Sequence, residues 1–180
     1  MQAPSLLKNV PILAGLSDAD LRELSTHLQP FTFRKDRTIV TKADEGSGLF
    51  IITKGHAKVV LSERNKGEVI LAFLKEGDFF GEMSLLDGRP RSASVVAQTD
   101  TELVALHRGD FLAFLQHRPR VALHLLEEMS LRLRDANSRI GSLALLDVYG
   151  RVARVLMDLG RKRGEVVDSQ IIIKDKPTQS

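Results

Sequence analysis

Cysteine is absent from this chain of 180 residues. Its absence excludes disulfides, thiolate zinc sites, cysteine-held iron–sulfur clusters and cysteine nucleophiles. No apolar run approaches the roughly 20 residues that a membrane-spanning helix needs. The N-terminus also lacks the basic start and the long apolar stretch of a signal peptide. We therefore expect a cytoplasmic protein with no membrane partner.

The composition is 43% hydrophobic and 27% charged, which suits one buried core with a smaller appendage. The net charge is +3, and it is unevenly distributed. Residues 1–117 contain 14 Lys and Arg against 15 Asp and Glu, whereas residues 118–180 contain 12 against 8. This surplus does not by itself indicate a nucleic-acid surface, because such surfaces cluster their cations. A solvated helical surface explains it as well.

Residues 17–28 are predicted to form one short helix. Ser17 is the expected cap, Asp20 occupies the capping-box position, and leucines follow at positions 21, 24 and 28. After residue 31 the pattern changes to short runs rich in β-branched and aromatic residues, at 38–41, 49–53, 57–61, 69–74, 93–97 and 102–106. Turn formers separate these runs at intervals of about ten residues. This rhythm is typical of an antiparallel sandwich or barrel.

Residues 118–145 are predicted to form one long helix with a narrow apolar seam. The seam residues are spaced alternately by four and three: Ala122, Leu126, Met129, Leu133, Ala136, Ile140 and Leu143. Such spacing over three heptads favours a parallel, symmetric homodimer through this helix. The alternative is a helix that lies on its own β domain, which would favour a wider apolar stripe.

The C-terminal part is predicted to contain a further helix at 149–159 and a short strand at 170–174. Pro177 and Thr178 then resemble the lead into another helix cap, yet no helix follows them. We expect either a truncated chain or a natural end before a missing domain.

Residues 79–94 differ from the rest of the β region, because they mix glycines, a proline, acidic residues and two arginines between apolar strands. Long insertions of this kind are usually functional. Gly81 would let backbone amides approach an anion. Arg91 and Ser92 offer donors to a phosphate, and the carboxylate of Glu82 suits sugar hydroxyls. The segment can therefore bind a sugar phosphate; the alternative is that Glu82 and Arg91 form an ordinary surface ion pair.

The sequences Phe80-Gly-Glu-Met-Ser-Leu-Leu and Arg89-Pro-Arg-Ser-Ala resemble the phosphate-binding cassette of cyclic nucleotide-binding domains. From about Leu7 to Ser180 the chain is similar to the sensor half of bacterial Crp/Fnr-family regulators of the cyclic AMP receptor protein type. The resemblance implies a mainly β protein with helices (α+β), built on a jelly-roll double-stranded β-helix barrel. It implies a barrel domain at 1–117, a dimerisation helix at 118–145, and at 146–180 a hinge and the start of a truncated or absent winged helix-turn-helix.

The resemblance also implies roles for individual residues. Ribose would be bound by Gly81 and Glu82, and the cyclic phosphate by Arg91, Ser92 and Ala93. The base would meet the long helix at Arg132, Ala136 and Asn137. The best-known member of the family has a threonine and a serine at the last two positions. Asn137 is nevertheless a competent partner for the edge of adenine.

The expected function is therefore cyclic nucleotide sensing, with cAMP as the effector and with neither catalytic activity nor a metal. DNA and RNA polymerase would be partners only of a full-length protein with its C-terminal domain. One alternative is the same fold responding to cGMP, a cyclic dinucleotide or a haem-bound gas. Another is a metal-dependent cupin-like enzyme, which needs clustered histidines. The five histidines are scattered and include no His-x-His pair: His27, His56, His107, His117 and His124.

Overall fold

The computed structural model describes residues 7–63, 67–167 and 170–173. The chain divides into two compact units, with the boundary between Glu128 and Met129. The boundary falls inside the long helix α5 (Pro119–Leu145). The division of the chain into a barrel at 1–117, a helix and a C-terminal segment stays a prediction.

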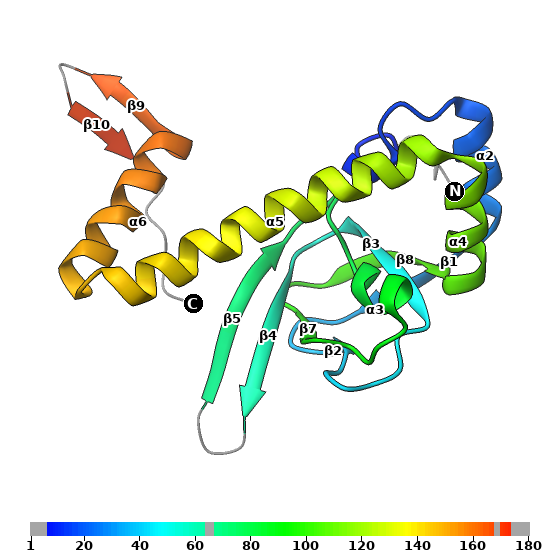
Figure 1. Cartoon of the computed structure of the whole chain (residues 1–180), viewed down its shortest axis with the longest axis horizontal. Coiled ribbons are helices and arrows are strands. Elements are labelled where there is room, and N and C mark those ends of the chain that lie inside the picture. The colour runs from blue at the N-terminus through cyan, green and yellow to red at the C-terminus, as the bar shows by residue number, and fades with distance from the viewer. Residues whose placement is uncertain (1–6, 64–66, 168–169, 174–180) are drawn as a thin grey trace. The chain divides into compact units, whose positions relative to one another are not determined.

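The first unit contains two four-stranded antiparallel sheets. One has the order β1 (Leu28–Phe33), β8 (Thr101–His107), β3 (Gly48–Lys54), β6 (Phe79–Phe80). The other has the order β2 (Thr38–Val40), β7 (Ser94–Ala97), β4 (Ala57–Glu63), β5 (Gly67–Leu74). Apart from the hairpin of β4 and β5, strands that are neighbours in a sheet are not consecutive in sequence, as a jelly roll requires. The β4–β5 hairpin extends beyond the rest of its sheet (Figure 1).

The core lies between the sheets, because buried side chains come from both of them. These side chains are Ile52, Ala57, Leu74, Phe80, Val95 and Leu103. Strand β8 shows how a strand contributes to this core. Its residues Thr101, Leu103 and Ala105 are buried, while Glu102 is exposed. Alternating side chains point to opposite faces of a strand, so one face can be apolar. The predicted α+β jelly-roll fold is confirmed.

The N-terminal helix α2 (Asp18–Thr26) begins where the sequence predicts. Ser17 accepts a hydrogen bond from the Asp20 backbone at 3.1 Å, and the Asp20 carboxylate accepts one from the Ser17 backbone at 3.2 Å. This reciprocal pair is the predicted capping box. The predicted helix end at residue 28 is wrong, because Leu28 opens strand β1 opposite Leu106.

Three short strands are missing from the sequence interpretation. Strand β1 contains Pro30, which cannot donate a backbone hydrogen bond, yet β1 is the edge strand of its sheet. Strand β6 has only two residues, and both belong to the segment interpreted as an insertion. Strand β9 (Gly164–Val167) pairs with β10 (Gln170–Ile173) in the second unit. Short strands like these depend on partners that lie elsewhere in the chain.

Helix α4 (Arg108–His117) precedes α5, and Arg118 between them joins the helices to α2. Arg118 donates to Asp20 at 2.7 Å and to Glu23 at 2.5 Å, and its guanidinium lies over the ring of Phe114. Within the first unit, this junction connects residues that are 95 and 98 positions apart.

The second unit contains the C-terminal part of α5, then α6 (Val148–Arg163) and the β9–β10 hairpin. Asp147 starts α6, because its carboxylate accepts a hydrogen bond from the Gly150 backbone at 2.8 Å. Arg154 of α6 donates to Ser138 of α5 at 2.7 Å. Helix α6 continues past Gly160, so the predicted end at residue 159 is wrong. None of the helices that the structure describes is apolar over a stretch long enough to span a bilayer.

Candidate functional site

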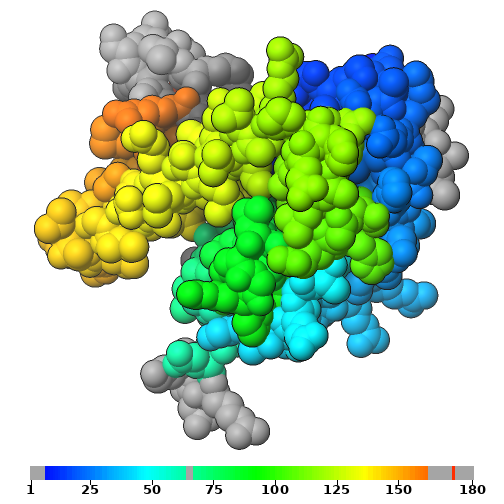
Figure 2. Space-filling model, turned by 45° about the vertical axis from the view of Figure 1, so that its right-hand side comes forward, coloured from blue at the N-terminus to red at the C-terminus, as the bar shows by residue number. Residues whose placement is uncertain are grey.

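The cassette, residues 79–94, is built around the short helix α3 (Glu82–Asp87). Gly81 precedes α3 with φ of 91°, and Gly88 follows it with φ of 70°. Both values are left-handed, a region that residues with a Cβ rarely occupy. Figure 2 shows this segment (green) at the surface of the first unit, next to α4.

Arg91 is the buried cation of the cassette, with 6% of its surface exposed. Its guanidinium donates to the carbonyl oxygen of Gly81 at 2.9 Å and to that of Gly48 at 2.8 Å. The same group lies 5.4 Å from the ring centroid of Phe50, within the range of a cation–π contact. Gly81 has no room for a side chain, because an added Cβ would collide with Nη1 of Arg91.

The backbone of Arg91 is fixed by the loop before β3. The amide of Arg91 donates to the carbonyl oxygen of Asp44, and the amide of Ala43 donates to that of Arg91, both at 2.9 Å. Lys42 adds a hydrogen bond from its backbone to the Ser94 hydroxyl at 2.9 Å. The loop therefore holds the main chain of the cassette arginine in place, while its side chain is held by Gly48 of β3 and by Gly81.

Two carboxylates act on Arg91. Burial lowers the pKa of its guanidinium, while the negative charges of Glu82 and Asp44 act in the opposite direction. An arginine stays protonated in proteins even so. Glu82 is itself 97% buried, as its exposed fraction of 3% shows, and it is the first residue of α3. An exposed surface pair is therefore the wrong interpretation of these two residues.

Ser92 and Ala93 follow Arg91 at the entrance to strand β7. Ser92 is exposed, and its hydroxyl donates to the sulfur of Met83 at 3.7 Å. Ala93 is half-buried. The structure thus brings together Gly81, Glu82, Arg91 and Ser92 from two arms of one segment, as the spacing in the sequence suggested.

Several contributors to this site were missed by the sequence interpretation, notably Asp44, Gly48 and Phe50. The signal available in the sequence was the close spacing of the two glycines at 46 and 48. Arg89, the other arginine of the cassette, lines a surface hollow of about 430 Å³ together with Ser84, Glu45 and Arg108.

The predicted base-contacting residues Arg132, Ala136 and Asn137 all lie on α5 in the second unit. Their contact with a base stays a prediction. The predicted seam of the same helix is largely exposed in the single chain: Leu126 63%, Leu133 62%, Ile140 63% and Leu143 70%. Met129 is half-buried and Ala136 is exposed. Large apolar side chains in a row on one helix are suited to a partner helix.

Across residues 7–63, 67–167 and 170–173, no three His, Cys, Asp or Glu residues are grouped so that they could hold a metal ion.

Comparison with known proteins agrees with this geometry. Residues 30–118 match the cyclic nucleotide-binding domain family. A cyclic AMP receptor protein from Thermus thermophilus is 35% identical over 156 residues, which are 87% of this chain and 72% of the relative. A CRP-like cAMP-activated global transcriptional regulator from Mycobacterium tuberculosis is 30% identical over 159 residues, covering 88% and 71%. The crystal structure of the Thermus thermophilus catabolite activator protein superposes with a TM-score of 0.68 and 35% identity, covering 74% of this chain and 63% of that one.

The fold and the cassette together define a cyclic nucleotide-binding domain. Within that class, the chain belongs to the family of CRP-like regulators.

Proposed function

We propose that this chain is the sensor of a dimeric transcriptional regulator and that its effector is cAMP. The observation that carries the proposal is the buried guanidinium of Arg91, which is held at the start of α3 by two carbonyl oxygens and lies beside Glu82. The named relatives, a cyclic AMP receptor protein and a cAMP-activated regulator, support cAMP as the effector. We assign no catalytic activity to the site, and the cytoplasmic location stays a prediction.

The proposed binding mode follows from the chemistry of the cassette. The two hydrogen bonds of Arg91 use two of its five N–H donors, so the guanidinium retains donors for a cyclic phosphate. Ser92 adds a hydroxyl, and Ala93 adds a backbone amide. Glu82 and the main chain at Gly81 bind the ribose, because a buried carboxylate is an acceptor that suits a sugar hydroxyl.

The base is assigned to α5 in this proposal. Asn137 offers both a donor and an acceptor to the edge of adenine, with Arg132 and Ala136 beside it on the helix. This assignment makes the preference for cAMP over cGMP a property of the helix rather than of the cassette. A ligand that contacts both elements favours one arrangement of the helix. The difference between its affinities for the two helix arrangements limits how far it can shift their equilibrium.

The output of the proposed sensor is transmitted through the helix pair. Two copies of α5 associate along the exposed seam, and Asp147 and Gly150 start α6 immediately after it. In a longer protein, α6 would lead into a winged helix-turn-helix that binds DNA and works with RNA polymerase.

Titration calorimetry with cAMP and cGMP tests the binding site. Arg91→Ala should weaken cAMP binding by about 10- to 150-fold for each charge-assisted hydrogen bond that is lost, because such a bond contributes about 1.5–3 kcal/mol. The matched control is Arg89→Ala, since Arg89 is an exposed arginine of the same cassette and should leave the affinity unchanged. Because Arg91 also holds two carbonyl groups, Glu82→Gln provides a second test, and it should weaken binding while the chain stays folded. Unchanged affinity in both Arg91→Ala and Glu82→Gln would refute the site.

Sedimentation analysis tests the dimer. Ile140→Asp should convert a dimer to monomers, because it places a charge on the seam. Leu131→Asp is the matched control, since Leu131 is similarly exposed, at 57%, but lies off the seam. A dimer that persists in Ile140→Asp, or one that is lost equally in Leu131→Asp, would show that another surface makes the contact.

A further inference from the structure

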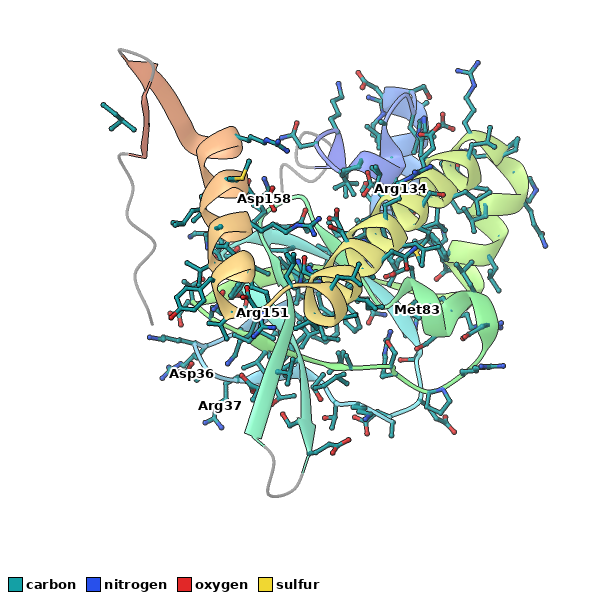
Figure 3. All side chains as sticks on the ribbon, turned by 60° about the vertical axis from the view of Figure 1, so that its left-hand side comes forward. Asp36, Arg37, Met83, Arg134, Arg151 and Asp158 are labelled. Carbon is teal, nitrogen blue, oxygen red and sulfur yellow. The ribbon has the colours of Figure 1, made fainter. Side chains whose placement is uncertain are left out.

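Met83 carries the only sulfur atom of the cassette. It is the second residue of α3, where Figure 3 labels it, and 46% of it is exposed. The Ser92 hydroxyl donates to its sulfur at 3.7 Å. The side chain is thus about half exposed, and its sulfur contacts a hydroxyl that the proposed function assigns to the cyclic phosphate.

We propose that Met83 is a site of reversible oxidation and that its sulfoxide weakens nucleotide binding. This inference rests on the proposed function of the cassette. The chain has no cysteine and four methionines, so methionine provides its only sulfur redox chemistry. The oxidant is a hydroperoxide, which is a small molecule that can reach a half-exposed side chain.

The reaction is a two-electron oxygen transfer. A lone pair of the Met83 sulfur attacks one peroxide oxygen, the O–O bond breaks, and the S–O bond of the sulfoxide forms. With hydrogen peroxide, the second oxygen leaves as water after a proton shift. Sulfur is oxidised and the peroxide is reduced, and methionine sulfoxide reductases reverse the change.

The consequence for binding follows from the contact with Ser92. A thioether sulfur is a weak acceptor, so the Ser92 hydroxyl can turn from it toward a phosphate oxygen at little cost. A sulfoxide oxygen is polar and accepts more strongly, so it retains the hydroxyl. It also places partial negative charge where an anion is to bind. The loss of one such hydrogen bond corresponds to about a tenfold lower affinity.

The chain provides a matched control in Met157. This methionine lies on α6, outside the cassette, and is 58% exposed, so a peroxide should oxidise it at least as readily. Leucine retains the apolar volume of methionine without the sulfur. Glutamine at position 83 imitates the polar sulfoxide without any oxidant.

The experiment treats wild type, Met83→Leu and Met157→Leu with hydrogen peroxide. Peptide mass spectrometry maps the sulfoxides, and calorimetry measures the dissociation constant for cAMP before and after treatment. We expect a rise of about tenfold in wild type and Met157→Leu, no change in Met83→Leu, and recovery after treatment with methionine sulfoxide reductases. Met83→Gln should bind cAMP about tenfold more weakly without treatment.

Three results would overturn the inference: a Met83 that stays reduced while Met157 is oxidised, an unchanged affinity when Met83 is a sulfoxide, or an equal loss in Met83→Leu. Failure of the proposed function is distinguishable, because untreated wild type would then bind neither cAMP nor cGMP. That result would overturn both proposals before any oxidant is added.

Discussion

Replacement of Gly81 by alanine tests the geometry of the cassette most directly. At φ of 91°, the backbone of Gly81 is left-handed, which costs a residue with a Cβ about 1–2 kcal/mol. The new Cβ would also collide with Nη1 of Arg91 and lie 2.8 Å from the Gly48 carbonyl oxygen. The guanidinium would have to move and would give up hydrogen bonds that contribute about 1.5–3 kcal/mol each. We therefore expect Gly81→Ala to lower the free energy of unfolding by about 4 kcal/mol.

Gly88→Ala is the matched control, because Gly88 flanks the other end of the same helix. It is also left-handed, with φ of 70°, but an added Cβ there has nothing within 4 Å. Its cost should be the backbone term alone, about 1–2 kcal/mol. Gly81→Ala should moreover lower cAMP affinity by about 100-fold or more, whereas Gly88→Ala should leave it nearly unchanged.

Urea unfolding measures the stability of both variants, and calorimetry measures their binding. Equal losses of stability in Gly81→Ala and Gly88→Ala would refute the reasoning, because the prediction depends on the close contacts of the new Cβ with Arg91 and with the Gly48 carbonyl oxygen. Intact cAMP binding by Gly81→Ala would refute the role assigned to that guanidinium.

Two further predictions concern stability. Hydrogen bonds from Ser17 and then from Arg118 hold the pKa of the Asp20 carboxyl below its ordinary value of 3.8. A lowered folded pKa adds stability that is present above the unfolded pKa and is lost as the pH falls through the folded pKa. Urea unfolding at several pH values tests this. Asp20→Asn should be less stable than wild type at pH 7, and it should lose less stability than wild type as the pH falls below about 4. Parallel curves of stability against pH for the two proteins would contradict this. Phe79→Ala should lower the free energy of unfolding by about 3–5 kcal/mol, because Phe79 is buried in the core with 1% exposed. Phe73→Ala should lower it much less, because Phe73 is 65% exposed. Similar losses for the two variants in thermal or urea unfolding would contradict this.

The parts of the fold that were predictable are those governed by local rules. The capping box at Ser17 and Asp20 depends on residues three positions apart. The long helix predicted at 118–145 is observed as Pro119–Leu145, because an uninterrupted heptad pattern is visible within the helix itself. The six strand segments predicted between residues 38 and 106 correspond to β2, β3, β4, β5, β7 and β8, and the strand predicted at 170–174 corresponds to β10.

Two of the missed strands, β1 and β6, depend on partners distant in sequence. Strand β1 contains a proline and is mostly exposed, so only its pairing with β8 makes it a strand. The two residues of β6 pair with Phe50 and Ile51, some 30 positions earlier. Helix α2 ends early for the same reason, because Leu28 pairs with Leu106.

The candidate site divides in the same way. The sequence by itself indicated four of its residues, because Gly81, Glu82, Arg91 and Ser92 lie within one segment whose composition is unusual. It did not indicate Asp44, Gly48 or Phe50. Only the tertiary structure decided that Glu82 and Arg91 are buried rather than exposed, and that the carbonyl oxygens of Gly81 and Gly48 hold the guanidinium. The physical reason is that burial and hydrogen bonding depend on the packing of the segment against the loop and strand of residues 43–50, which lie more than 30 positions away in the chain.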